Sequence, residues 1–591
     1  MPFITDPNGK TQYVPGVYTA QRVVSNLPGA APQFLVPVLL GGGPEGHPYN
    51  ADASKQVQEA SYTPFKLVAT SAAAKDYFGE DSDIGVAMSW AKKHGLPYAY
   101  VANMGALTRA AVIVTSTGPI TQFTLYPRSW GAPANHIKIK ATSGTAFEFT
   151  PIKHYSMLTA NIASGDTRLF IKDNSWVRVG MTITLADNVT TNVTKTVLGV
   201  GFEYTSTGQK KPYVDITATA GSAFTTANYG MLLEYDDANV ESSGVLTNAQ
   251  ALVDWVNNSS KLFIAVKAGT FSNPAALIAV ASATVLKDIA AWSTVTKGTS
   301  PAPTSSDYTS FVALMEATAW DLFVQQEGVL PQAFYVADSS STIHATMRDW
   351  AIDKRAEGHP ISVTTGGAWG DVVLSAGNDT DPLYRANALN SQDVMLCAGG
   401  LDRVAAYLSL GPAVWGRRID GGLGHNLTND SLLYSEVEKQ WDERVSLNLT
   451  NLHRRGVVSY RLGEASKRYV ISQGLSTLQG QGATAWNEGT NDTPLVMQRD
   501  LADFIDRTLR EDLDGSQVGA DRVSPETLAA VIVRRAQRTL EPRGYIAKGS
   551  FRITSIALNE GGTGYDVVWS VRLPTTTDFI TATTSILIGE E

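Results

Sequence analysis

The alternation of hydrophobic and polar positions changes character several times along the 591 residues. Near the start, an apolar run at 34–40 is followed by a helical period over 84–94 and a second apolar run at 98–101. Buried strands separated by a helix are the expected result, which is the pattern of an α/β domain. The pattern returns after residue 245, with helices expected over 248–256, 274–292 and 343–355 and strands over 262–266, 333–336, 361–364 and 394–397.

A different pattern separates these two stretches, between residues 118 and 236. It is dense in Thr, Val, Ile and Gly, and it alternates in short runs such as His136-Ile137-Lys138-Ile139-Lys140. Turn residues recur roughly every ten positions, which is typical of antiparallel strands in a sandwich or barrel. The pattern therefore predicts an all-β domain inserted between two α/β parts.

The last part of the chain predicts a small domain of two helices followed by strands. Leu501, Ile505 and Leu509 share one face of the first helix. The second helix opens with Ser524-Pro525-Glu526, which supplies an N-cap, a proline at the first helical position and an early acid. A clean period of two over 565–573 then predicts a strand.

These changes of pattern divide the chain into six parts. The expected fold class is α/β and α+β multidomain, with an inserted all-β domain and extended arms at both ends. The parts are an N-terminal arm (1–30), a first α/β part (31–117), the inserted β-rich domain (118–240), a second α/β part (241–490), a C-terminal domain of helices and antiparallel strands (491–579) and a C-terminal arm (580–591).

Both ends of the chain predict extended segments. The first residues combine Pro, Gly and short alternating runs such as Val17-Tyr18-Thr19-Ala20, with no helical period. Near the other end, Ile580, Ala582, Ile586 and Ile588 occupy even positions and would form one apolar face of a strand. A lone domain would expose that face at its edge, so a neighbour's sheet is the expected partner. Ordinary fraying is the alternative for the first few residues.

Charge and composition argue against several classes of partner. Only 17% of the residues are charged, whereas soluble domains average about 25%, so polar uncharged residues or partners must cover much of the surface. The net charge is −9 and no basic stripe is present, so nucleic acid is not an expected partner. The most apolar stretch, 274–286, is shorter than the ~18 residues of a spanning helix, and the N-terminus carries no secretory signal pattern. No membrane partner is expected. The protein is expected to be synthesised in a cytoplasm.

The sequence offers no constellation that predicts catalysis, a metal or a cofactor. The eight histidines are scattered and lack metal-binding spacing. The single cysteine, Cys397, lies in an apolar run and is expected to be a small buried hydrophobe. The glycine run Gly41–Gly46 resembles a phosphate loop only in glycine content, because the Gly-Lys-Ser/Thr ending is missing. A flexible turn is the expectation there.

Several segments, taken in order, resemble one known family. They are Val14-Pro15-Gly16-Val17-Tyr18, Val38-Leu39-Leu40-Gly41 with Gly43-Pro44-Glu45-Gly46, Tyr77-Phe78-Gly79, Trp130-Gly131 with Asn135, Gly474-Leu475-Ser476-Thr477-Leu478, Arg499-Asp500 and Gly544-Tyr545-Ile546. Together they resemble the contractile tail sheath family of phages and related injection machines. Two departures stand out: Ala-Pro-Ala widens the spacing between Gly131 and Asn135, and the arm after Tyr18 lacks the family's acidic pair.

The resemblance implies a structural subunit rather than an enzyme. Such a subunit polymerises in stacked hexameric rings as a helical sleeve around a tail tube, and contracts to drive the tube through the host envelope. The implied partners are copies of the same chain, the tail tube protein, and the baseplate and tail terminator proteins, in a virion tail. Strand exchange between neighbours is expected at Val14, Val17, Tyr18, Val23, Ile580, Ala582, Ile586 and Ile588.

The helix expected over 525–540 is the candidate for contact with the tube. Ala529, Ile532, Val533, Ala536 and Leu540 share one apolar face. The basic residues that point to the opposite side are Arg534, Arg535 and Arg538. A basic ridge would fit an acidic tube through exposed ion pairs that are individually modest. A solvated helix face is the alternative.

Two other classes of function remain open at this stage. One is a non-contractile surface or tail-associated protein, such as an adhesin, built around the Thr-rich stretch 118–236. The other is an enzyme that uses the second α/β part, although it would need a convergent polar cluster that the sequence does not reveal. Helical sleeves of the purified protein in electron micrographs would separate the sheath from both.

Overall fold

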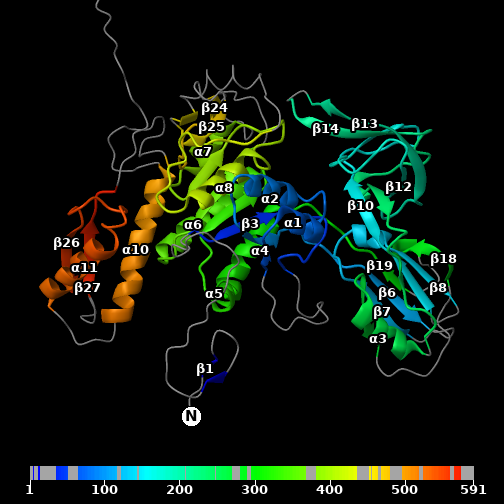
Figure 1. Cartoon of the computed structure of the whole chain (residues 1–591), viewed down its shortest axis with the longest axis horizontal. Coiled ribbons are helices and arrows are strands. Elements are labelled where there is room, and N and C mark those ends of the chain that lie inside the picture. Colours follow the sequence, from blue (N-terminus) through cyan, green and yellow to red (C-terminus); the bar gives the residue numbers. More distant parts are fainter. Residues whose placement is uncertain are drawn as a thin grey trace, which may run out of the picture. The chain divides into compact units, whose positions relative to one another are not determined.

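The computed structural model of the chain is shown in Figure 1. The described residues are 4–5, 11–12, 35–50, 64–115, 121–142, 146–205, 208–246, 248–268, 280–288, 294–367, 381–434, 452–453, 455–462, 468–478, 495–517, 524–558 and 565–573. The chain forms two units, 1–34 and 35–591. In the first, β1 (Ile4–Thr5) pairs antiparallel with β2 (Thr11–Gln12).

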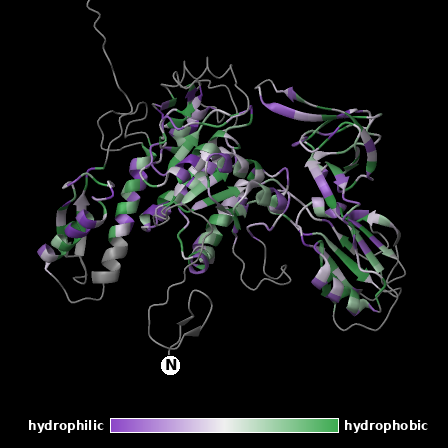
Figure 2. Cartoon of the chain, in the orientation of Figure 1, coloured by the Kyte–Doolittle hydropathy of each residue, from purple (hydrophilic) through white to green (hydrophobic). Residues whose placement is uncertain are grey.

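A seven-stranded sheet, called the central sheet below, organises the α/β part. Its strand order is β23-β22-β21-β20-β3-β5-β4, and every pair is parallel except β4 with β5. The strands are β3 (Pro37–Gly41), β4 (Lys66–Val68), β5 (Ala99–Asn103), β20 (Ala333–Ala337), β21 (Ser362–Gly366), β22 (Val394–Cys397) and β23 (Val457–Val458). Every residue of β3, β5, β20 and β22 is buried, as expected for parallel strands covered on both faces. Figure 2 shows hydrophobic residues concentrated along these strands.

Helices cover both faces of the central sheet. One face packs against α1 (Ser71–Phe78), α2 (Asp83–Lys93) and α8 (Leu410–Gly421). The other packs against α4 (Ser305–Leu314), the π-helical turn η5 (Met315–Ala319), α5 (Trp320–Glu327), α6 (Ser341–Ala356) and α7 (Pro382–Leu389). The hydroxyls of Thr70 and Ser82 cap α1 and α2 by accepting backbone N–H groups. The predicted helices over 84–94 and 343–355 and the four later strands are thereby confirmed.

Three antiparallel sheets lie between residues 111 and 296. The first contains β17 (Phe263–Lys267), β7 (Thr121–Pro127), β6 (Ala111–Thr115) and β19 (Thr294–Thr296), and the second β16 (Glu241–Ser242), β9 (Ala146–Thr150), β8 (Lys138–Thr142) and β18 (Val280–Val285). These two share one hydrophobic core with α3 (Ala249–Ser259). The third, the six-stranded sheet, contains β10 (Ile152–Met157), β15 (Met231–Tyr235), β12 (Thr182–Ala186), β13 (Val193–Tyr204), β14 (Lys210–Ile216) and β11 (Arg168–Phe170), and has a core of its own.

The helix predicted over 274–292 is wrong where the structure describes that stretch. Residues Val280–Val285 form β18, and a short 3-10 turn, η4 (Leu286–Asp288), follows. Thr284 and Val285 pair with Ile139 and Lys138 of β8. A short apolar run does not distinguish a helix from a buried strand, and the β-branched side chains fit the strand better. Pairing with β8, which is distant in the sequence, therefore determines that this stretch is a strand.

Two helices and a hairpin, called the C-terminal module below, end the described part of the chain. They are α10 (Val496–Gln517), α11 (Pro525–Thr539), β26 (Arg552–Leu558) and β27 (Tyr565–Ser570), and the two strands pair antiparallel. Leu501, Ile505 and Leu509 are buried, as the sequence predicts for one face of α10. The Ser524 hydroxyl accepts the N–H of Thr527 at 3.3 Å, which confirms the predicted N-cap.

The segment Trp130–Asn135 lies against the glycine run that follows β3. Gly131 has a φ of +91°, and a Cβ placed there would lie 1.9 Å from the carbonyl oxygen of Pro44. The Asn135 side chain exchanges two hydrogen bonds with the backbone of Gly298, at 2.7 and 2.8 Å, and donates to Asn188 Oδ1 at 2.8 Å. Gly131 and Asn135 thus connect three parts of the chain. These are the glycine run of the central sheet, the segment around Gly298 that leads from β19 back to that sheet, and the six-stranded sheet.

Gly131→Ala is expected to lower the free energy of unfolding by about 2–5 kcal/mol, because left-handed strain and overpacking add. Gly180 is the matched control, since its φ is +88° but no atom lies within 4 Å of an added Cβ. Gly180→Ala should therefore cost only the strain, about 1–2 kcal/mol. Thermal unfolding of both variants measures the difference, and equal losses would contradict the close contact with Pro44.

Candidate functional site

The usual ligand crevice of a doubly wound sheet is filled by the chain itself. Ligands bind such sheets where the strand order reverses, at the carboxyl ends of the strands, which here means after β3 and β20. Asn103 Oδ1 accepts the N–H of Gly43 at 3.1 Å, and Asn103 Nδ2 donates to the carbonyls of Gly43 and Glu45 at 3.1 and 2.7 Å. A Cβ on Gly42 would meet Pro303 at 2.9 Å. The glycine run is thus held by internal contacts, in contrast to the flexible turn expected from its composition.

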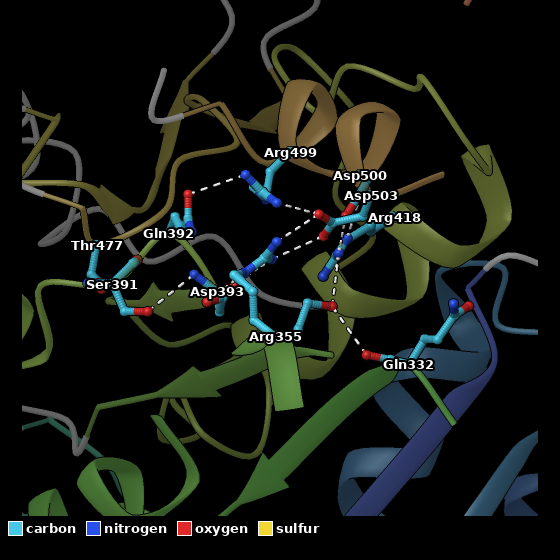
Figure 3. Close-up of polar contacts among 11 residues, drawn as sticks. Gln332, Arg355, Ser391, Gln392, Asp393, Arg418, Thr477, Arg499, Asp500 and Asp503 are labelled. Atoms are coloured by element: carbon cyan, nitrogen blue, oxygen red, sulfur yellow. Dashed lines mark hydrogen bonds and ion pairs between the residues drawn. The ribbon is translucent and has the colours of Figure 1, made fainter. Parts of the chain in front are cut away.

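A network of arginines and aspartates joins α10 to the central sheet (Figure 3). The buried Arg418 of α8 donates from Nε to Asp500 Oδ2 at 2.9 Å, and from Nη2 to the hydroxyl of Ser362 at 2.9 Å. Arg418 and Asp500 expose only 4% and 8% of their side chains. An ion pair with almost no solvent contact therefore connects α8 to the first turns of α10. The hydrogen bond from the same arginine to Ser362 adds the start of β21.

A second arginine extends the network. Arg355 of α6 donates to both oxygens of Asp503, at 2.7 and 3.0 Å, and from Nε to Asp393 at 2.8 Å. Arg499 pairs with Asp503 one turn away on α10 and donates to Gln392 Oε1 at 3.2 Å. Arg355 presents to Asp503 the forked geometry that matches a carboxylate. α10 is thereby fixed in position and rotation against α6 and the segment before β22.

Burial dominates the electrostatics of this network. It raises the pKa of Asp503 to about 7, although the guanidinium of Arg355 acts in the opposite direction. Burial also raises the pKa of Asp393 and of Asp500, against the attraction of Arg355 and Arg418. Desolvation therefore outweighs pairing at all three carboxyls. Such networks define where an element lies more than they add to stability.

The residues predicted to face a tube lie on α11. Arg534 and Arg538 are exposed and Arg535 is half-buried. The opposite face packs inward through Leu528, Ile532, Ala536 and Leu540. Ala529 and Val533, which were assigned to the same apolar face, are half-buried. The residues predicted for strand exchange lie outside the described residues; they are Val14, Val17, Tyr18, Val23, Ile580, Ala582, Ile586 and Ile588.

The C-terminal module has further exposed basic side chains that the sequence reasoning missed. They are Arg543, Lys548, Arg552 and Arg572. The signal was available, because these cations follow the α11 arginines in a chain whose net charge is −9. These residues add to the exposed arginines of α11 within the C-terminal module.

The hairpin of the C-terminal module is a sheet of two strands. Among the described residues, β26 and β27 pair only with each other, and α11 packs beside β26. The side chain of Val568 on β27 is 53% exposed. Two-stranded sheets are marginally stable alone, and uncovered strand edges are templates for further strands. Within the described residues, neither strand of the hairpin therefore has a second strand beside it.

Metal sites and membrane-spanning helices are absent from the part of the chain that the structure describes. The described residues contain no group of three or more His, Cys, Asp or Glu side chains that could hold a metal ion. Within the same residues, the helices are too short or too polar to cross a membrane. Cys397 is buried, and burial raises its pKa well above the ordinary value of a thiol.

The elements above define a mixed α/β multidomain protein with several sheets. No protein-family model and no curated protein matches the sequence. Among solved structures, the chain is similar to the sheath tail protein from Desulfitobacterium hafniense, with 12% identity, a TM-score of 0.46, and coverage of 95% of this chain and 100% of that one. It is similar to a sheath tail protein from Listeria innocua, with 12% identity, a TM-score of 0.47, and coverage of 92% and 93%. A third similarity is to the contracted helical sheath of the anti-feeding prophage, with 12% identity, a TM-score of 0.33, and coverage of 49% and 77%. All three are sheath proteins.

Proposed function

We propose that this protein is the subunit of a contractile tail sheath, a structural protein that polymerises helically around a tail tube and shortens to drive the tube through an envelope. The observation that carries the proposal is the contact between two family motifs that are far apart in the sequence. Gly131 of the Trp-Gly motif lies against Pro44 of the glycine run after β3. Asn135 of the same motif accepts the N–H of Gly298, in the segment that leads from β19 back to the central sheet. The motifs therefore act as one structural unit.

Helical assembly needs an interface that does not close, together with a connection that survives rotation of the subunits. Strands donated from chain ends provide such a connection, because main-chain hydrogen bonds hold while the linker bends. In this proposal the donors are the segments 14–23 and 580–588, and the hairpin β26–β27 is the acceptor. The inserted β-rich domain, 118–240, lies on the outside of the sleeve, and the domain 491–579 faces the tube.

The proposed partners are copies of the chain, a tail tube protein, and baseplate and terminator proteins. The first test is self-assembly. The purified protein at high concentration should form tubular polymers in the contracted arrangement, because no tube is present to template the extended one. Negative-stain electron microscopy and sedimentation velocity report the outcome. Monodisperse monomers across a wide range of salt and protein concentration would refute the proposal.

The basic face of α11 gives a second test, of the tube contact alone. Changing Arg534, Arg535 and Arg538 to glutamine should leave self-assembly intact and weaken co-sedimentation with purified tube. Folding should change little, by about 0.5 kcal/mol or less for each surface substitution. Tube binding should fall much more, because equivalent subunits repeat each weak contact along the tail.

The control variant for the tube contact replaces Lys261 and Lys267, which are exposed cations of the β-rich region. It should bind the tube as the parent does. High salt should weaken tube binding by the parent protein toward the level of the triple variant, since exposed ion pairs are screened. Co-sedimentation that is unchanged in the triple variant would place the tube contact elsewhere in residues 491–579.

A further inference from the structure

The six-stranded sheet meets the α/β core at the link between α1 and α2. Strand β10 stands at one end of the strand order of that sheet. Within the described residues, its outer edge pairs with no named strand, and the carbonyl oxygen of Met157 accepts the N–H of Lys172 at 3.0 Å. Asp81 of the link covers this edge, because its carboxylate accepts the N–H of Met157 and the hydroxyl of Ser156, the latter at 3.2 Å. Asp81 is only 3% exposed. The buried carboxyl group of Asp81 thus connects the edge of the six-stranded sheet to the α/β core.

More carboxyl groups surround the same contact. The hydroxyl of Tyr155, also on β10, is buried near Glu45, Glu80 and Asp81 and has no hydrogen-bond partner among the described residues. A Cβ placed on Gly79 would lie 2.1 Å from that hydroxyl, so the ring is pressed against the link. Glu80 Oε1 pairs with His154 Nδ1 at 2.7 Å, whereas Glu80 Oε2 is buried without a hydrogen-bond partner. Three carboxyl groups therefore gather around one strand.

Cations do not balance this cluster. Glu45 and Asp81 form no ion pair with any residue in the described part of the chain, and Lys172 pairs with Asp83 at 3.5 Å instead. The charged and titratable groups that face the contact come from five segments. They are Glu45 after β3; Lys75, Glu80, Asp81 and Asp83 of the α1–α2 region; Lys153, His154 and Tyr155 of β10; Lys172, Asp173 and Arg178 after β11; and Glu234 of β15.

We propose that this contact is a proton-controlled joint, which holds the six-stranded sheet against the α/β core while Glu45 and Asp81 are neutral and releases it when both ionise. The joint is a property of the single subunit and does not depend on the proposed assembly. Closure buries Asp81 and half-buries Glu45, neither with a partner cation in the described part of the chain. Two ionised carboxylates in that position would lose hydration and repel Glu80.

The direction of the pH dependence follows from the same burial. Burial raises the pKa of Glu45 and of Asp81 to about 7, whereas carboxyl groups exposed by opening would return to about 4. The closed joint therefore binds more protons than the open one between those values. Closure weakens as the pH rises from about 4 to about 7 and changes little above that range. A protonated His154 would attract Glu80 and also favour closure, while Lys172 attracts an ionised Asp81 and opposes release.

The geometry allows a direct measurement of the joint. Lys75 and Arg178 line one cavity of about 570 Å³ between the two bodies. Ala72 is exposed on α1, and Val179 is 67% exposed beside Arg178. Spin labels on cysteines at these two positions report the width of the joint by pulsed electron paramagnetic resonance. Cys397 is buried and stays unlabelled.

At pH 5 the labelled protein should show one short distance, and at pH 8.5 this population should be lost. The double variant Glu45→Gln with Asp81→Asn should keep the short distance at both values, because the amides are neutral throughout. Asp76→Asn, which changes an exposed acid of α1, is the control and should behave as the parent. Distance distributions that are identical at both pH values in the parent would overturn the proposal, as would release of the double variant at pH 8.5. If the double variant does not fold, each single variant is used, and release as complete as in the parent in both would overturn it.

Discussion

Replacement of Arg418 by methionine is expected to detach α10 from the central sheet and to lower the free energy of unfolding by about 3–5 kcal/mol. The change leaves Asp500 buried without its cation, and Asp500 exposes only 8% of its side chain. The hydroxyl of Ser362 loses its donor as well. Few surface changes approach this size, because the main penalty comes from an uncompensated buried charge rather than from a lost contact.

The measurement is differential scanning calorimetry combined with limited proteolysis, which reports whether α10 has become accessible. Lys140→Met is the control, since Lys140 pairs with Glu148 at 2.8 Å but 31% of its side chain is exposed. That variant should lose about 1 kcal/mol or less. Arg418→Met combined with Asp500→Leu should recover most of the loss, because both charges are then gone. A double variant no better than the single one would contradict the buried-charge explanation.

The parts of the fold that local pattern controls could be predicted. Leu501, Ile505 and Leu509 define a helix face by their spacing, and Ser524-Pro525 marks a helix start, so α10 and α11 follow from the sequence. The buried parallel strands can also be recognised in the sequence, because strands covered on both faces are continuously apolar. In all of these cases the physical cause lies within one element.

The parts that distant pairing controls could not be predicted. Residues Val280–Val285 read as part of a helix because their strand partner, β8, lies far earlier in the chain. The ion-pair network is a stronger example, since Arg355 and Asp503 come together only after α6 and α10 pack. Arg499-Asp500 was recognised as a family motif, yet nothing in the sequence pointed to Arg418 as its partner. Charged residues carry no period that identifies a distant counterion.

The buried network and the proton-controlled joint have the same physical basis. In both, desolvation of a carboxyl group outweighs the attraction of nearby cations and raises its pKa to about 7, at Asp503 in the network and at Asp81 in the joint. The difference is the direct cation. Asp503 keeps Arg355 on both oxygens, so α10 stays fixed, whereas Asp81 relies on neutral donors. The network is therefore expected to stay rigid over the range in which the joint responds, from about pH 4 to about pH 7.

Deletion of residues 580–591 is expected to abolish assembly while leaving a folded monomer. The motivation is the alternation of Ile580, Ala582, Ile586 and Ile588, which makes one apolar strand face. If a neighbour's sheet, such as the hairpin β26–β27, receives that face, its loss removes the connection between subunits. Circular dichroism and thermal unfolding should be close to those of the parent, and sedimentation velocity should show monomers only.

A matched pair of full-length variants separates the strand face from mere chain length. Serine at the four apolar positions should abolish assembly as the deletion does. Alanine at the intervening positions 581, 583 and 585 should leave assembly intact, because in the proposed strand those side chains would point to the other face. The apolar face alone would then account for the connection between subunits. Sleeves that form from the truncated chain, or equal defects in the two variants, would show that strand exchange through this segment is wrong.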